Sequence, residues 1–276
     1  MKQDASTTAP ETGLHPLKAL TRFAGTTCII AELEARKLRH DPTELITRAL
    51  QPTLWLLVFG QVLARVKGFP IGDMRYLDYL APGVLAQSVL FIAIFYGITI
   101  IWERDLGIVH KFLASPAPRA ALVLGKALSA GVRGLSQAVI VYLLAWLLGV
   151  KINWSPLALA GVVAAVALGA ALFSTFSLII ACLVKTRERF MGIGQLMTMP
   201  LFFASNAIYP IEIMPAWLRV VARVNPLTYE VQALRSLMLA GGGATFAGVS
   251  LDLGILAGTT ALLVAIAAKL YPTVVR

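Results

Sequence analysis

Charged side chains are scarce in this sequence of 276 residues. They make up 14% of it, whereas about 25% is usual for a soluble domain. Apolar residues reach 58%, above the roughly 45–50% that soluble chains show even with glycine counted. A soluble fold of this size could not bury so much apolar surface, so the excess must face lipid. The sequence therefore predicts an integral membrane protein.

Residues that carry metal or covalent chemistry are also few. The two cysteines, Cys28 and Cys182, lie on different segments and form neither a metal-binding spacing nor a disulfide framework. The three histidines are scattered over stretches outside the apolar runs, so they predict no ligand cluster and no catalytic triad; they are His15, His40 and His110. We therefore expect no metal site and no catalytic residues in this chain.

A nucleotide-binding loop is missing as well. Gly125-Lys126 is suggestive, but Ala127 stands where a phosphate-binding loop needs Ser or Thr, and Ala120 stands where it needs its first glycine. The chain is thus predicted to be no enzyme by itself and to hold no cofactor. Any energy source for its function must be supplied by another molecule.

Six long apolar stretches are present, each able to cross about 30 Å of hydrocarbon as a helix of roughly 20 residues. They lack the alternation of barrel strands, so the predicted fold is an all-α membrane protein with six transmembrane helices. Two of them begin with capping residues, Asp41-Pro42 and Ser155-Pro156. The predicted spans are residues 46–63, 80–101, 121–150, 156–184, 190–209 and 249–268.

The basic residues, which give a net charge of +10, lie mostly between these stretches. There they orient the spans and contact anionic headgroups, so no nucleic-acid partner is expected. With the N-terminus inside, 16 of the 24 Lys and Arg fall on the cytoplasmic side and 7 on the other, with Arg133 inside a span. The positive-inside rule then predicts a multi-pass protein with both termini in the cytoplasm. We expect the membrane to be the cytoplasmic (inner) membrane of a bacterium.

The region before the first span divides into two parts. Residues 1–16 are polar without an apolar core, and we expect a disordered cytoplasmic tail. Residues 17–40 mix Leu, Phe and Ile with Lys and Arg, which predicts an amphipathic helix on the inner membrane surface; a solvated cytosolic helix is the alternative. The remaining residues, 41–276, would form the six-helix domain.

The stretch 103–118, after the second predicted span, is a short helix-like segment with charges at both ends and apolar residues between them. An apolar anchor with a polar rim suits a docking surface for another protein. A plain connecting turn with interfacial charges is the alternative.

Two stretches resemble the type-2 ABC exporter permeases, in particular the subgroup of daunorubicin-resistance and nodulation-factor export permeases. One is Glu103-Arg104 with Gly107 and the ending Leu113-Ala114-Ser115-Pro116; the other is residues 205–218 with Asn225-Pro226-Leu227-Thr228-Tyr229. The resemblance implies re-entrant helices in an outer segment, 210–240, between spans five and six. Pro210, Pro215 and Pro226 would break that segment into short helices, and Asn225-Pro226 predicts an N-cap followed by proline at the first helical position.

The resemblance also implies a function and its partners. The chain would be the transmembrane subunit of an exporter for an amphipathic substrate, such as a drug, a lipid-linked molecule or a glycan. Two copies of a separate ATPase subunit would bind ATP and Mg, and a second permease chain, as a homodimer, would complete the assembly among membrane lipids. The residues expected to couple to the ATPase are Glu103, Arg104, Gly107, Phe112, Ser115 and Pro116.

Polar and aromatic residues in the spans are candidates for a substrate path. Arg133 shares a helix face with Ser129, Ser136 and Gln137, and an arginine inside the membrane costs roughly 2.5–3.5 kcal/mol, so it should face protein or water. It would contact an anionic substrate or a lipid phosphate; an internal partner, or a position near the headgroups, is the alternative. The full set of candidates is Arg133, Gln137, Gln195, Phe202, Asn206 and Tyr209.

An ion-coupled secondary transporter is the alternative function. Proton or sodium coupling usually needs a carboxylate within the membrane. No acidic residue lies deep inside a predicted span, since Asp252 falls near the outer end of the sixth. This absence weighs against ion coupling, and energy from ATP is what the resemblance implies.

Overall fold

The computed structural model describes residues 42–65, 74–107, 119–184, 186–241 and 245–271. The predicted tail 1–16, the predicted amphipathic helix 17–40 and the cap at Asp41 lie outside these ranges. Within them the chain is helical and contains no strand; Ile152 and Leu239 alone form an isolated antiparallel bridge. The all-α class is confirmed.

The long helices are α4 (Tyr76–Tyr96), α5 (Ile98–Asp105), which continues α4 after Gly97, α7 (Arg119–Leu147), α8 (Pro156–Leu183), α9 (Arg187–Phe203) and α12 (Phe246–Leu270). A first helical run consists of α2 (Pro42–Leu54), a π-helical turn η1 (Trp55–Phe59) and α3 (Gly60–Leu63). Short helices η2 (Ile211–Ile213), α10 (Ala216–Val224) and α11 (Pro226–Met238) stand between α9 and α12.

Four helical runs are long and apolar enough to cross a membrane: Tyr76–Asp105, Leu122–Leu147, Pro156–Leu183 and Phe246–Leu270. They match the second, third, fourth and sixth predicted spans. The first run and α9, which has 17 residues, are not among the four. The membrane class follows from these four helices, and the count of six stays a prediction.

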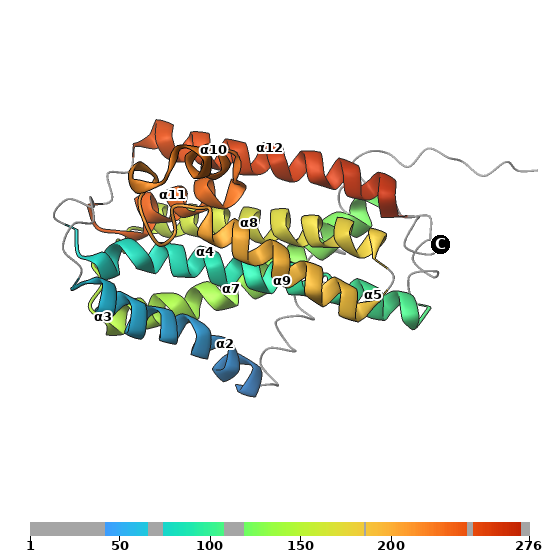
Figure 1. The fold of residues 1–276 in the computed structure, drawn as a ribbon, viewed down its shortest axis with the longest axis horizontal. Coiled ribbons are helices and arrows are strands. Elements are labelled where there is room, and N and C mark those ends of the chain that lie inside the picture. The colour runs from blue at the N-terminus through green and yellow to red at the C-terminus, as the bar shows by residue number, and fades with distance from the viewer. Residues whose placement is uncertain (1–41, 66–73, 108–118, 185, 242–244, 272–276) are drawn as a thin grey trace, which may run out of the picture.

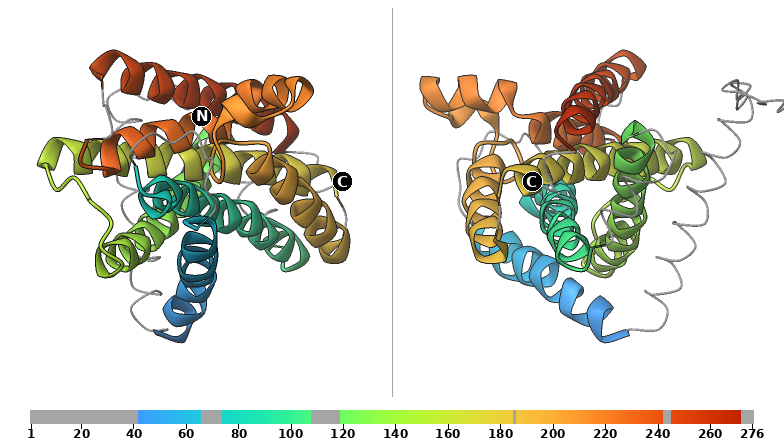
Figure 2. Two further views of the ribbon diagram at one scale, coloured as in Figure 1. Left: turned by 60° about the vertical axis from the view of Figure 1, so that its left-hand side comes forward. Right: turned by 90° about the vertical axis from the view of Figure 1, so that its right-hand side faces the viewer.

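Helix α8 lies at the centre of the bundle. It contacts α4, α7, α11 and α12, and most of its residues are apolar. Helices α12 and α2 lie on opposite sides of it, and α10 and α11 gather at the end away from α5 (Figure 1; Figure 2). The two ends of the bundle are called here the α5 end and the α10–α11 end.

Local capping fixes two helix starts as the sequence predicts. The backbone N–H of Ala158 donates to the Ser155 hydroxyl at 3.2 Å, ahead of α8. The N–H of Leu227 donates to Asn225 Oδ1 at 3.0 Å, ahead of α11. In both cases a proline follows the cap at the first helical position, where its missing N–H costs nothing.

The fifth helix is shorter than predicted. It ends at Phe203, not at residue 209, and the chain turns over residues 204–210 before η2. The reason is a distant donor: the Asn225 side-chain amide donates to the carbonyls of Leu201 at 2.7 Å and Ala204 at 2.9 Å. These bonds satisfy carbonyl groups that the end of the helix leaves without an intrahelical partner.

This turn, residues 204–210, packs tightly on α4. The Tyr76 and Tyr79 hydroxyls donate to the carbonyls of Ile208 and Asn206 at 2.8 and 2.9 Å. Between them the backbone of Ala207 lies against Gly83, so close that a β-carbon at Gly83 would collide with the Ala207 carbonyl. Glycine at position 83 is therefore what lets the turn reach the helix.

We expect Gly83→Ala to destabilise the protein, because neither the α4 backbone nor the Ala207 carbonyl can move aside easily. Overpacking of this kind costs about 1–3 kcal/mol. The matched control is Gly254→Ala on α12, where an added β-carbon meets no atom within 4 Å, and alanine is the better helix former. Thermal unfolding of both variants in detergent measures the difference. Equal midpoints would contradict the close approach.

Candidate functional site

The α5 end carries a cluster of charges that joins four helices. Its members are Glu103, Arg104, Asp105, Lys126 and Arg187, and it is called here the end cluster. Lys126 on α7 donates to both carboxylate oxygens of Glu103 at 2.5 and 2.7 Å. Both side chains are partly buried, with 15% and 26% of their surface exposed, so water screens this pair only in part.

The second half of the end cluster ties α5 to α9. Arg187 at the start of α9 donates to Asp105 at 2.8 and 3.2 Å, and its guanidinium lies 4.2 Å from the ring centre of Trp102. Arg104 pairs with the same carboxylate at 3.4 Å and donates to the Val184 carbonyl, just after α8, at 3.3 Å. The last two turns of α5 are thus held by α7, α8 and α9 together.

This arrangement gives the end of α5 a fixed orientation. Exposed ion pairs contribute little individually, about 0–1 kcal/mol, but bonds to three different helices restrain the direction of α5. Directly after it, Gly107 closes the described part of the segment with a φ of +68°, a conformation that favours glycine. A displacement of the segment after α5 would be passed to α7 and α9 through these pairs.

The predicted coupling residues divide accordingly. Glu103, Arg104 and Gly107 lie at the α5 end, and the first two bind other helices of the same chain. Their predicted contacts with an ATPase stay a prediction. Phe112, Ser115 and Pro116 lie outside the described residues.

The predicted path residues do not form one site. Gln137 on α7 is buried and donates to the Arg48 carbonyl on α2 at 3.2 Å. One turn earlier, the Arg133 guanidinium lies 5.0 Å from the ring centre of Tyr96. Arg133 and Gln137 therefore form one group with Arg48.

The other four candidates follow α9 and the turn after it. Gln195 is exposed on α9, whereas Phe202 is buried. The Phe202 and Trp55 rings meet edge to face, with their centres 5.3 Å apart. Asn206 is buried in the turn, where its carbonyl accepts from Tyr79 and from Arg235 at 2.8 Å. The Tyr209 hydroxyl donates to the Phe203 carbonyl at 2.5 Å. Apart from Gln195, these residues hold the end of α9 in place.

A buried acid that the sequence did not single out lies on α11. Glu230 is fully buried, and neither carboxylate oxygen has a hydrogen-bond partner among the described residues. It fits against α8 because Gly169 has no β-carbon there. Burial raises the pKa of Glu230 well above its ordinary range, so the neutral acid is the favoured form. The sequence placed Glu230 in the predicted segment of short helices, but no local pattern indicated that its side chain is buried.

Within the described ranges, no three His, Cys, Asp or Glu side chains are placed to hold a metal ion. The described residues instead form helix ends restrained by ion pairs, buried polar groups and four long apolar helices.

These features define a class, that of polytopic helical membrane proteins with a braced charged end and short helices at the opposite end. The chain belongs to the ABC-2 type transporter family, whose model matches residues 26–239. This membership confirms the resemblance drawn from residues 103–116 and 205–229, and it identifies a membrane permease of an ABC transporter. It also argues against the ion-coupled alternative.

Several relatives share this family. The chain is 26% identical over 259 residues to the daunorubicin resistance ABC transporter permease protein DrrB1 of Streptomyces coeruleorubidus, which covers 94% of this chain and 89% of the relative. It is 28% identical over 206 residues to the transport permease ycf38 of Cyanophora paradoxa, covering 73% and 70%. It is 24% identical over 207 residues to nodulation protein J of Rhizobium leguminosarum bv. viciae, covering 74% and 77%.

Exchanging the partners of the pair between α5 and α7 tests the end cluster. Lys126→Glu places two carboxylates side by side and should cost about 1.5–3 kcal/mol, the range for hydrogen bonds to charged groups. The double variant Glu103→Lys with Lys126→Glu restores opposite charges and should recover most of the loss. Thermal unfolding in detergent at low salt measures both. If the double variant were no more stable than Lys126→Glu, the two residues would not interact.

The buried acid should make stability depend on pH. Folding favours protonated Glu230, so the free energy of unfolding falls as pH rises above the unfolded pKa of about 4.3, until the folded pKa is passed. Glu230→Gln removes this dependence and should be more stable than the parent protein, by a margin that grows between pH 5 and pH 8. Unfolding midpoints over this range measure it. A margin that shrank with rising pH would show that Glu230 is ionised in the fold.

Proposed function

We propose that this chain is the permease subunit of an ATP-driven exporter of an amphipathic substrate in a bacterial inner membrane. The observation that carries the proposal is the end cluster. An ABC permease must convert motion of a separate ATPase into motion of its helices, and here the last turns of α5 are fastened to α7, α8 and α9. A push on residues 103–107 would therefore be passed to α7, α8 and α9.

The family supports a partnership with an ATPase subunit, and the composition of the assembly is part of the proposal. Two copies of this chain would bind two ATPase subunits, which hold ATP and Mg, at the α5 end. That end would face the cytoplasm together with both termini. The first helical run and α9 would complete six spans, and η2, α10 and α11 would form the re-entrant segment on the outer side. Helix α10 supports this placement, because its exposed apolar side chains, Trp217, Val220, Val221 and Val224, suit the outer interface.

Co-expression of this chain with the open reading frames beside it tests the proposal. A soluble chain with a phosphate-binding loop should co-purify, and the complex should hydrolyse ATP. The double variant Glu103→Ala with Arg104→Ala should reduce transport in vesicles by at least about tenfold per ATP hydrolysed, because α5 loses its fastening. The control Arg223→Ala removes a positive charge from α10, at the opposite end, and should leave the ratio unchanged.

The ion-driven alternative gives the opposite pattern. If no ATPase co-purified and an ion gradient alone drove transport, the proposal would be overturned. Glu230→Gln and Asp252→Asn would then be expected to abolish transport, because Glu230 and the largely buried Asp252 are acids of the kind that carry protons.

A further inference from the structure

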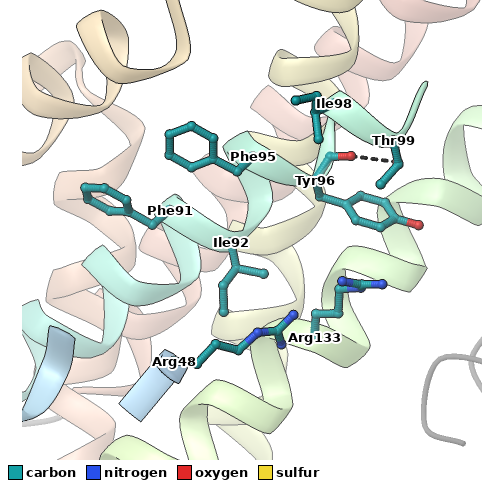
Figure 3. A pocket seen from close by; sticks show the side chains of 8 residues that line it. All are labelled: Arg48, Phe91, Ile92, Phe95, Tyr96, Ile98, Thr99 and Arg133. Atoms are coloured by element: carbon teal, nitrogen blue, oxygen red, sulfur yellow. Dashed lines mark hydrogen bonds between the residues drawn. The ribbon is translucent and has the colours of Figure 1, made fainter. Parts of the chain in front are cut away.

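A cavity of about 350 Å³ opens between α2, α4 and α7 (Figure 3). This volume lies within the range of about 300–1,000 Å³ that is usual for small-ligand pockets. Its walls combine two arginines with apolar and aromatic side chains, and none of the residues that line it is acidic. The lining side chains used here are Arg48, Ile92, Phe95, Tyr96 and Arg133.

The two arginines are brought together by the fold. Gln137 holds the α2 backbone at Arg48, and Arg133 lies one turn before Gln137 on the same face of α7. Figure 3 shows both guanidinium groups on the same side of α4, with the Ile92 side chain next to them. Arg133 also lies over the Tyr96 ring, which fixes its direction. Two positive charges on the wall of one apolar cavity suit a ligand with a compact anionic group and an apolar chain.

The position along the helices gives the depth of the cavity. Trp102 is half exposed, and an exposed tryptophan near the end of an apolar helix marks the membrane–water interface. Tyr96 precedes it by six residues, about 9 Å along a helix. The cavity therefore lies one to two turns inside the interface, just below the headgroup level, where the first carbons of an amphiphile are found and where the two arginines can draw in its anionic group.

We propose that this cavity binds the phosphate headgroup of an amphiphile in the leaflet at the α5 end, through Arg48 and Arg133. Arginine presents a planar fork of donors that matches phosphate oxygens. The apolar wall formed by Ile92 and Phe95 receives the first part of the chain. Either a bilayer phospholipid or a phosphorylated amphiphile in transit has this chemistry. The inference stands independently of ATP-driven export, because it concerns binding by this chain alone.

Equilibrium binding of radiolabelled farnesyl phosphate to the purified chain, in nanodiscs of phosphatidylcholine, tests the proposal. Saturable binding is expected, with unlabelled farnesyl phosphate competing and farnesol or inorganic phosphate competing at least about tenfold more weakly. Arg48→Gln with Arg133→Gln should weaken binding by about tenfold or more. Arg223→Gln, which removes a charge from α10, is the matched control and should bind as the parent protein does.

A second variant distinguishes loss of the binding site from loss of the fold. Ile92→Trp fills the cavity and leaves both charges in place, so it should weaken binding to a similar degree while the unfolding midpoint stays near that of the parent. Equal affinity of the parent and both cavity variants, or equal competition by farnesol, would overturn the proposal.

Nanodiscs that contain phosphatidylglycerol then distinguish the two sources. A fall in apparent affinity for farnesyl phosphate assigns the site to a bilayer phospholipid. An unchanged affinity assigns it to a phosphorylated amphiphile other than the bulk lipid. Either result supports the phosphate site, and neither depends on an ATPase.

Discussion

The buried turn between α9 and η2 depends on one constraint, which is that backbone carbonyls removed from water need donors. When α9 stops at Phe203, its last carbonyls and those of the turn have no helical partner. Side chains from two distant helices and from the cap of the second supply the missing bonds: Tyr76 and Tyr79 from α4, Arg235 from α11 and Asn225 at the N-cap of α11. Because unsatisfied carbonyls each cost about 1–3 kcal/mol, these bonds fix how α4, α9 and α11 meet.

Arg235 shows how tightly this part is determined. Its guanidinium is partly buried, donates to the Asn206 carbonyl and lies 3.8 Å from the ring centre of Tyr79, which binds the same carbonyl. These contacts offset part of the cost of removing the cation from water, since a buried cation without partners is strongly unfavourable, and of its buried nitrogen atoms only Nε has no hydrogen-bond partner among the described residues. The turn is thus part of the folded core at the α10–α11 end. Motion at that end has to involve the turn, α4 and α11 together.

Features that depend on local sequence were predictable. Long apolar runs gave four of the spans, and the caps at Ser155 and Asn225 followed from a polar residue before a proline. The end of α9 was not predictable, because it depends on Asn225, which follows more than twenty residues later. The same limit applies to Glu230 and Gly169, which meet where α11 packs on α8 although they lie 61 positions apart in the sequence. Local patterns state what a segment prefers, and only packing decides which distant residue it meets.

The candidate site shows the same division. Glu103 and Arg104 were identified from a motif. The motif could not reveal that Lys126 donates to Glu103, or that Arg104 donates to the carbonyl at the end of α8. Arg133 was recognised as costly inside a membrane, with an internal partner or a place near the headgroups as the alternative to an anion. The structure combines these possibilities: Tyr96 contacts the guanidinium, and Trp102 places both near the interface. An arginine at this depth is stabilised by an aromatic face and still presents donors to a cavity, so its structural and binding roles do not exclude each other.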